Sequence, residues 1–440
     1  MTMALVDAAI VGRQSSTGLA AVSLGGSLVF AAVCPAMGIS MAVEPIASQA
    51  RGAGEPERAD DALRAGVLAS LLLSAPTMLL ALLSTLLLEL VGVPDEVARE
   101  TRWFVVWRLP GVVGWLLFMV AKAALEAEGR VGPLLVSSWA TNVVNLLVCA
   151  LLVLGDGALA WIGLPPAGLP ALGVAGAGLA TTLSSGLLAW LALRAALRGG
   201  AWGGRTRLRE LWPEVSTQLR VGLPIGLQLL TEVGAFSVAG LLAGRLGPTV
   251  TAAHQVAMGI ASFTFMGVLG IGGATAVRVG RRVGEGTHAG ARRAGLAGIA
   301  LGAAYMATCA GLVVVFAPRV AGLFSVDPEV ISTAAPLLTV AAAFQVFDGV
   351  QGVAGGALRG AGDTRFASWA NAASHWSVGL PLALVLAFGL GHGVLGLWWG
   401  LGVGLVIVAG TLLARFLWLT ARPIARLQPD VTNITAPETP

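Results

Sequence analysis

The feature that most constrains this chain is a set of long segments without any Asp, Glu, Lys or Arg. They are residues 14–43, 65–88, 131–155, 157–193, 246–277, 294–318 and 366–414. A helix of about 20 mostly apolar residues is long enough to cross a bilayer. Charged residues make up 11% of the chain, whereas a soluble globular protein has roughly a quarter. The sequence therefore excludes a soluble enzyme and predicts an all-α polytopic membrane protein.

Twelve transmembrane helices follow from this pattern. Segment 366–414 is long enough for two spans, with a break predicted near residues 389–393. Three shorter apolar runs that contain single charges add three more spans: 103–125, 221–244 and 330–357. Residues 1–12 supply the remaining helix. They are too few to cross a bilayer, so we expect the natural protein to begin upstream of Met1.

Basic residues set the expected orientation. Of the 27 Lys and Arg residues, 21 fall on one side of the twelve-helix scheme and 6 on the other. Cytoplasmic loops carry the excess of Lys and Arg in membrane proteins. We therefore expect a multi-pass protein of the inner cell membrane with both termini in the cytoplasm.

The second half of the chain repeats the first at an offset of 232 residues. Gly12-Arg13 recurs as Gly244-Arg245, and Gly52 recurs as Gly284. Two halves with the same orientation predict two six-helix lobes related by a pseudo-two-fold axis along the membrane normal.

This repeat divides the chain into four parts. They are an N-terminal lobe with a truncated first helix (1–199), a cytoplasmic basic linker (200–219), a C-terminal lobe (220–427) and a cytoplasmic tail (428–440). We interpret the Arg-rich region around the linker as a solvated connection and not as a nucleic-acid site.

Three acidic residues are expected to lie inside the membrane: Asp7, Glu232 and Asp348. A carboxylate in hydrocarbon costs several kcal/mol unless it is paired, protonated or facing a wet cavity. Neither Glu232 nor Asp348 has a Lys or Arg nearby in its own helix, so we expect no internal ion pair. Such acids can exchange H⁺, bind Na⁺ or attract organic cations. A structural, hydrogen-bonded acid is the alternative interpretation.

Polar and aromatic side chains near these acids are candidates for lining a substrate cavity. The candidates are Gln228, Thr231, Asn142, Asn145, Phe344 and Gln351. The first two flank Glu232 on one helix, and the last two lie about one turn to either side of Asp348. The two asparagines share one face of the helix at 131–155, where they either line the cavity or bridge helices.

The sequence has no motif for enzymatic chemistry. It contains no glycine-rich phosphate-binding loop, no zinc-binding spacing and no nucleophile–base pair. We therefore expect neither an enzyme nor a cofactor. The expected ion is a coupling cation, Na⁺ or H⁺, with Glu232 and Asp348 as the ligands in the case of Na⁺.

Three stretches point to a known family. The most specific runs from Gly222 to Glu232 (GLPIGLQLLTE), and the second from Phe344 to Gln351 (FQVFDGVQ). The third joins Val6-Asp7 to residues 11–24 and 49–54. In these stretches the chain resembles the multidrug and toxic compound extrusion (MATE) family, in particular its NorM-type branch, in family order and at family spacing.

The resemblance implies a V-shaped pair of six-helix lobes that exports cationic, amphipathic drugs in exchange for Na⁺ or H⁺ by alternating access. Carried over by position, Asp7, Glu232 and Asp348 correspond to the family's cation-coupling acids. The implied partners are cationic drug-like small molecules and the lipid bilayer, without nucleic acid. One two-lobed chain is expected to work as a monomer.

Two positions depart from the family pattern. Cys149 stands four residues after Asn145, where one branch has a coupling aspartate, so the acids of the C-terminal lobe are expected to carry the coupling. Phe344 stands where NorM-type relatives often have a tyrosine, so a hydroxyl ligand for Na⁺ is lost there.

Two other functions were weighed against drug export. A flippase for lipid-linked saccharides has a related two-lobed architecture, but it is expected to have a basic cavity, whereas the intramembrane charges here are acidic. A non-transporting scaffold or receptor has no need of mid-membrane acids on two helices of one lobe.

Overall fold

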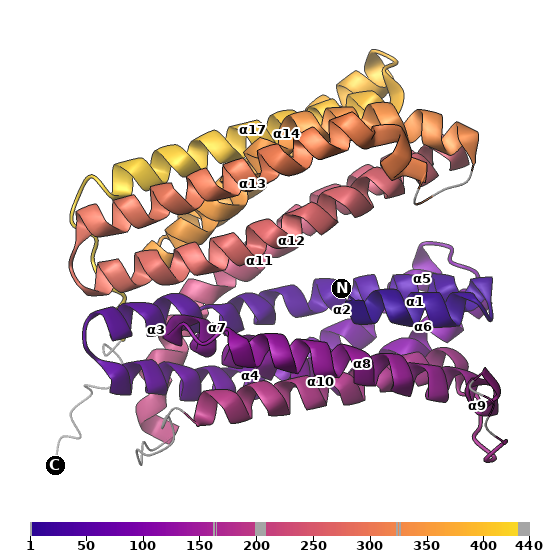
Figure 1. Ribbon diagram of the computed structural model, residues 1–440, viewed down its shortest axis with the longest axis horizontal. Coiled ribbons are helices and arrows are strands. Elements are labelled where there is room, and N and C mark those ends of the chain that lie inside the picture. Colours follow the sequence, from indigo (N-terminus) through magenta and orange to yellow (C-terminus); the bar gives the residue numbers. More distant parts are fainter. Residues whose placement is uncertain are drawn as a thin grey trace. The chain divides into compact units, whose positions relative to one another are not determined.

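The computed structural model describes residues 2–161, 163, 165–198, 208–322, 324 and 327–429 (Figure 1). Every regular element within these residues is helical. Helices suit a bilayer because each main-chain N–H and C=O group then finds its partner within its own segment. The predicted all-α fold is confirmed.

The helices follow one another with short connections. The first half contains α1 (Thr2–Gly12), α2 (Ser16–Met41), α3 (Val43–Gly52), α4 (Pro56–Ser84), α5 (Leu87–Leu90), α6 (Asp95–Arg108), α7 (Gly111–Glu128), α8 (Gly132–Leu154), α9 (Asp156–Trp161) and α10 (Gly173–Leu197). The second contains the 3₁₀ turn η1 (Leu208–Leu211), α11 (Trp212–Gly244), α12 (Pro248–Gly284), α13 (His288–Gly322), α14 (Pro328–Ala361), α15 (Thr364–Ala372), the π-helical turn η2 (Ala373–Gly379), α16 (Leu380–Leu384), the π-helical turn η3 (Val385–Gly389) and α17 (Gly393–Leu419).

The membrane spans agree with the predicted number. Within the described residues, ten helical stretches are long and apolar enough to cross a membrane, and the pair α6–α7 makes eleven. That pair is bent by 51° at Leu109-Pro110, where the proline cannot donate the N–H that a continuous helix needs. With the shorter apolar helix α1, the total is consistent with twelve. The break predicted near residues 389–393 is confirmed between η3 and α17.

The uncharged segment 157–193 is divided between α9 and α10, with a non-helical connection between them. Asp156, the first residue of α9, organises this connection. Its carboxylate accepts hydrogen bonds from the main-chain N–H groups of Ala167, Gly168 and Leu169 at 3.0 to 3.1 Å. A single acid thus takes up three main-chain donors that helix geometry cannot satisfy.

A low pH should weaken the hydrogen bonds that Asp156 makes to this connection. The N–H groups of Leu169, Ala167 and Gly168 bond to the ionised carboxylate and hold the pKa of Asp156 below its usual value. Its stabilisation is complete above the ordinary carboxyl pKa and is lost as the pH falls through the lowered pKa. We expect Asp156→Asn to speed amide exchange of residues 167–169 at neutral pH, measured by hydrogen–deuterium exchange. Equal exchange in the two proteins would contradict this role.

Two compact units make up the structure. Unit 1 comprises the described residues up to Val43, those from 59 to 226, and Pro429, and unit 2 comprises Glu44–Arg58 and Leu227–Gln428. In unit 1, α10 packs against α6, α7 and α8, and in unit 2, α14 packs against α12, α13 and α17 (Figure 1). Two helical bundles agree with the two lobes expected from the repeat.

The lobe boundaries taken from the sequence stay predictions. Residues 200–207 of the predicted linker and 430–440 of the predicted tail lie outside the described residues.

Helix α14 is fixed at both ends. Asp327 caps its first turn by accepting a hydrogen bond from the main-chain N–H of Glu329 at 2.9 Å. Gly362 ends the helix at a φ of +86°, a left-handed conformation that favours glycine. Buried residues of its second half pack against α17 and other helices of unit 2, among them Val353, Ala354, Ala357 and Leu358. Asp348 therefore lies on a helix that is held in place at both ends.

Small residues let α2 approach the first part of α11 closely in unit 1. A Cβ atom at Gly38 would lie 2.1 Å from the main-chain nitrogen of Gly226 and 2.6 Å from the carbonyl oxygen of Gly222. The two backbones therefore meet without intervening side chains, as is common for helices packed in a membrane.

Substituting Gly38 should destabilise unit 1. We expect Gly38→Ala to lower the melting temperature in detergent, because overpacking of this kind costs about 1–3 kcal/mol. Gly26, on the same helix, has no atom within 4 Å of its Cβ position, so Gly26→Ala is the matched control and should leave the melting temperature unchanged or slightly raised. Equal melting temperatures for the two variants would show that the contact is not tight.

Candidate functional site

Glu232 lies where three elements of unit 2 meet. Its carboxylate, on α11, accepts hydrogen bonds from Gln351 Nε2 on α14 at 3.3 Å and from Asn371 Nδ2 on α15 at 3.4 Å. The two amide side chains are buried, whereas Glu232 is partly exposed. The site therefore combines fixed donors with a carboxylate that a cation can reach.

Asp348 forms an acidic pair with Glu232. It lies on α14, three residues before Gln351, it is partly exposed, and its charge interacts with that of Glu232. Two like charges in one site repel, so the pair favours a shared cation. The structure thus brings together three of the residues that the sequence singled out, Glu232, Asp348 and Gln351.

His375 and Asn371 belong to the same site, and the sequence search did not select them. The charge of His375 interacts with Glu232. Its Nδ1 donates to the carbonyl oxygen of Asn371 at 3.1 Å, so Nε2 is the ring nitrogen left for another partner. His375 Nε2 and Asn371 Oδ1 are both buried and have no hydrogen-bond partner within the described residues. The site thus holds two buried polar atoms that are free to interact.

The π-helical turn η2 explains how His375 comes to this place. A π turn inserts a wider i→i+5 bond into the helix that begins with α15, and such turns are frequent at functional sites. Helical periodicity relates each acid only to residues of its own helix, and His375 comes from a neighbouring one. The available signal was the pair of polar residues four apart, Asn371 and His375, within the uncharged segment 366–414.

The other candidates of unit 2 have different surroundings. Thr231 donates its hydroxyl to the carbonyl oxygen of Gln228 at 2.9 Å, and its own carbonyl accepts from Trp376 Nε1 at 2.9 Å. Phe344 is buried and meets Trp399 edge to face, with ring centroids 5.1 Å apart. Phe344 therefore packs in the helix interface, whereas Gln228 and Thr231 are partly exposed.

Asp7 lies in a second buried polar cluster, in unit 1. The hydroxyl of Thr181, on α10, donates to its carboxylate. Asn145 and Cys149, both on α8, lie close enough to interact with the same carboxylate. The charge of Arg108, at the end of α6, also interacts with it. Among the described residues, neither the Oδ1 nor the Nδ2 atom of Asn145 has a partner at hydrogen-bond geometry. Sequence reasoning missed Thr181 and Arg108, because both come from other helices.

Asn142 and Asn145 have different surroundings. Asn142 Nδ2 donates to the carbonyl oxygen of Ser138 in its own helix at 2.8 Å. Asn145 is fully buried beside Asp7. The three-residue spacing places both on α8, yet only Asn145 reaches the acid.

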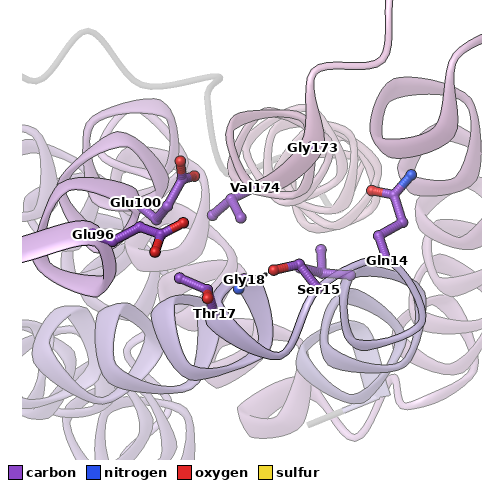
Figure 2. Close-up of a pocket in the computed structure, with 9 residues that line it drawn as sticks. Gln14, Ser15, Thr17, Gly18, Glu96, Glu100, Gly173 and Val174 are labelled. Atoms are coloured by element: carbon purple, nitrogen blue, oxygen red, sulfur yellow. Dashed lines mark hydrogen bonds between the residues drawn. The ribbon is translucent and has the colours of Figure 1, made fainter. Parts of the chain in front are cut away.

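Unit 1 also contains a cavity of about 190 Å³. Figure 2 shows Glu96 and Glu100 of α6 on one side of it and Gln14 and Ser15 on the other. Val11, one turn from Asp7 on α1, also lines it. Its lining is partly apolar and includes two carboxylates, which favour positively charged solutes over anions. No residue of the cavity was a candidate in the sequence.

Comparison with known proteins decides the family. A sequence profile of the MatE family matches residues 1–151 and 224–385, well over half of the chain. The chain belongs to the MatE family.

Curated relatives extend the match to almost the whole chain. The probable multidrug resistance protein NorM of Deinococcus radiodurans is 38% identical over 430 residues, which cover 95% of this chain and 91% of that protein. The protein of the same name from Bradyrhizobium diazoefficiens is 35% identical over 435 residues, covering 96% and 90%.

Solved structures of MATE transporters show the same fold. The eukaryotic MATE transporter AtDTX14 superimposes with a TM-score of 0.84 at 22% identity and covers 97% of this chain and 94% of its own. The Vibrio cholerae MATE transporter VcmN in its bent form gives a TM-score of 0.80 at 19% identity, covering 96% and 93%.

Membership of the MatE family confirms the fold class and the family predicted from the sequence. The relatives are transporters, so this MatE protein is a multi-pass membrane transporter and not an enzyme. The roles of the individual site residues stay predictions.

The hydroxyl of Thr181 should matter for the stability of this MatE protein. Thr181→Val keeps the shape but leaves the buried Asp7 without its hydroxyl donor, which costs about 1–3 kcal/mol. We expect a lower melting temperature for Thr181→Val than for Thr181→Ser, which keeps the donor. Thr308→Val, at an exposed hydroxyl that bonds only within its own helix, is the control. Equal losses in both Thr181 variants would mean that packing and not the hydrogen bond is responsible.

Proposed function

We propose that this MatE protein is a secondary active multidrug exporter that antiports cationic, amphipathic compounds against Na⁺ or H⁺ by alternating access. Its relatives are named as multidrug resistance proteins, which supports the class of substrate. The observation that carries the proposal is the acidic pair Glu232–Asp348 inside a helical bundle, in which Glu232 accepts from two amide donors.

The acidic pair gives a chemical reason for exchange. Ionised carboxylates attract an organic cation, and neutralisation by Na⁺ or H⁺ weakens that attraction. Unneutralised carboxylates in a closed apolar interior cost several kcal/mol. The protein therefore does not change between its outward-facing and inward-facing states unless a cation is bound at the site. The drug and the coupling ion therefore bind alternately to the same two carboxylates.

The residues around the pair suit either coupling ion. For Na⁺, the carboxylates of Glu232 and Asp348 supply oxygen ligands, and Asn371 Oδ1 is a buried neutral oxygen without a hydrogen-bond partner in the described part of the chain. For H⁺, the carboxylates themselves are the acceptors. Asp7 is proposed as a third coupling acid, in unit 1.

The setting of this activity is part of the proposal. We place the protein in the inner membrane with both termini in the cytoplasm, as the distribution of Lys and Arg supports. Its partners are cationic drug-like molecules and lipid, without nucleic acid. It works as a monomer and needs no cofactor besides the coupling ion.

The test is ethidium transport in proteoliposomes, with Na⁺ and pH gradients imposed separately. We expect one of the gradients to drive transport, which names the ion. Glu232→Gln and Asp348→Asn should reduce driven transport to the level of empty liposomes, because each removes a charge from the pair. Parental rates in both variants would refute the assignment.

The control variant is Glu285→Gln. Glu285 lies in the turn between α12 and α13, is exposed and pairs with Arg282. Losing this surface pair should leave transport unchanged, because such pairs contribute little. If no gradient drives ethidium transport by correctly folded parent protein, a flippase for lipid-linked saccharides becomes the better proposal.

A further inference from the structure

The chain leaves α17 as a short non-helical segment, residues 423–428, which we call the strap. The main chain of Leu427 is bound on both sides. Its N–H donates to Gln49 Oε1 at 2.8 Å, and its carbonyl oxygen accepts from Arg58 Nη2 at 2.7 Å. Both side chains come from the segment 44–58, far away in the sequence.

Three further contacts fix the strap. The N–H of Ile424 donates to His288 Nδ1 at 3.2 Å, and Arg426 forms an ion pair with Glu55 at 3.2 Å. The side chain of Leu427 lies over Gly362, where a Cβ atom would be 3.0 Å from Leu427 Cδ2. The strap is thus seated on the first residue of α13, the end of α14 and the segment 44–58.

Gln49 joins the strap to α14. Its Nε2 donates to the carbonyl oxygen of Gly360 at 2.9 Å, one of the last carbonyls of α14, which have no partner within the helix. The side chain is fully buried. Gly360 and Asp348 lie 12 residues apart on α14, or about 18 Å along one helix. A shift of α14 at the acidic pair therefore reaches Gln49 through a rigid element.

The segment 44–58 has a special place in the chain. It belongs to unit 2, whereas the residues directly before and after it belong to unit 1. Its attachment to unit 2 therefore depends on noncovalent contacts. These are the bonds to the strap and to Gly360, together with the close seat of α3 on α12, where a Cβ atom at Gly284 would lie 2.1 Å from the carbonyl oxygen of Gln49.

We propose that the strap, Gln49 and Arg58 form a lock that holds segment 44–58 on unit 2 and that opens and closes in each transport cycle. The lock rests on the proposed antiport function for its role, but its geometry can be tested without transport. Its opening breaks the hydrogen bonds of Gln49 and Arg58 and separates α3 from its close seat on α12.

The first experiment measures amide exchange of residues 424–428 in the purified protein. Gln49→Leu removes both hydrogen bonds of the side chain while keeping its bulk, so these amides should exchange about tenfold faster or more. Ser48→Ala is the matched control, because Ser48 is equally buried on α3 and bonds only within its own helix. Exchange as slow in Gln49→Leu as in the parent would overturn the lock.

The second experiment closes the lock covalently. Glu55→Cys and Arg426→Cys, in a Cys309→Ser background, are joined by a bifunctional methanethiosulfonate reagent that a reductant cleaves. We expect the cross-link to stop ethidium transport and reduction to restore it. Each single cysteine variant, treated alike, should keep transporting. Transport at the uncross-linked rate with the bridge in place would overturn an opening step in the cycle.

The two experiments separate the lock from the proposed function. If even the parent protein transports no cationic dye, the antiport function fails, and amide exchange in Gln49→Leu still decides whether the lock exists. Faster exchange together with cross-link inhibition supports the whole proposal. Faster exchange with unaffected transport leaves a structural tie and rejects the role in the cycle.

Discussion

The cost of an ionised carboxylate inside a helical bundle governs the composition of both polar clusters. In unit 1, Asp7 has a hydroxyl donor and the permanent charge of Arg108 as neighbours. In unit 2, Glu232 has two neutral amide donors and the imidazole of His375 as neighbours. The two clusters therefore differ in charge: a permanent positive charge interacts with Asp7, whereas Glu232 and Asp348 add their own like charges.

Close helix packing is what makes such clusters rigid. Glycines at the α2–α11 contact remove the side chains that would otherwise separate the helices. In unit 2, α14 is capped at both ends and enclosed by α12, α13 and α17. Side chains that project from elements held in this way keep their relative positions, so the weak bonds of 3.3 and 3.4 Å to Glu232 can still define its orientation.

The sequence was sufficient to predict the membrane spans and the charged residues within them, because both can be recognised in one helix at a time. Uncharged segments gave the spans, and Asp7, Glu232 and Asp348 were visible as single charges within them. Partners from other helices could not be found in this way, because helical periodicity says nothing about which faces meet. Thr181 and His375 are partners of this type. The strap could not be predicted either, because Leu427 is bound through its main chain and main-chain hydrogen bonds do not depend on the type of residue.

The π-helical turn η2 makes the surroundings of Glu232 sensitive to chain length. A π turn accommodates one residue more than an α turn, so the extra residue fits between α15 and α16 without rotating one against the other. Deleting one residue between Ala373 and Gly379 would therefore turn the wide turn into a regular one and redirect the side chains of the turn itself, among them His375. Point substitutions leave the wide turn intact, so in this helix an insertion or deletion is the more drastic evolutionary step.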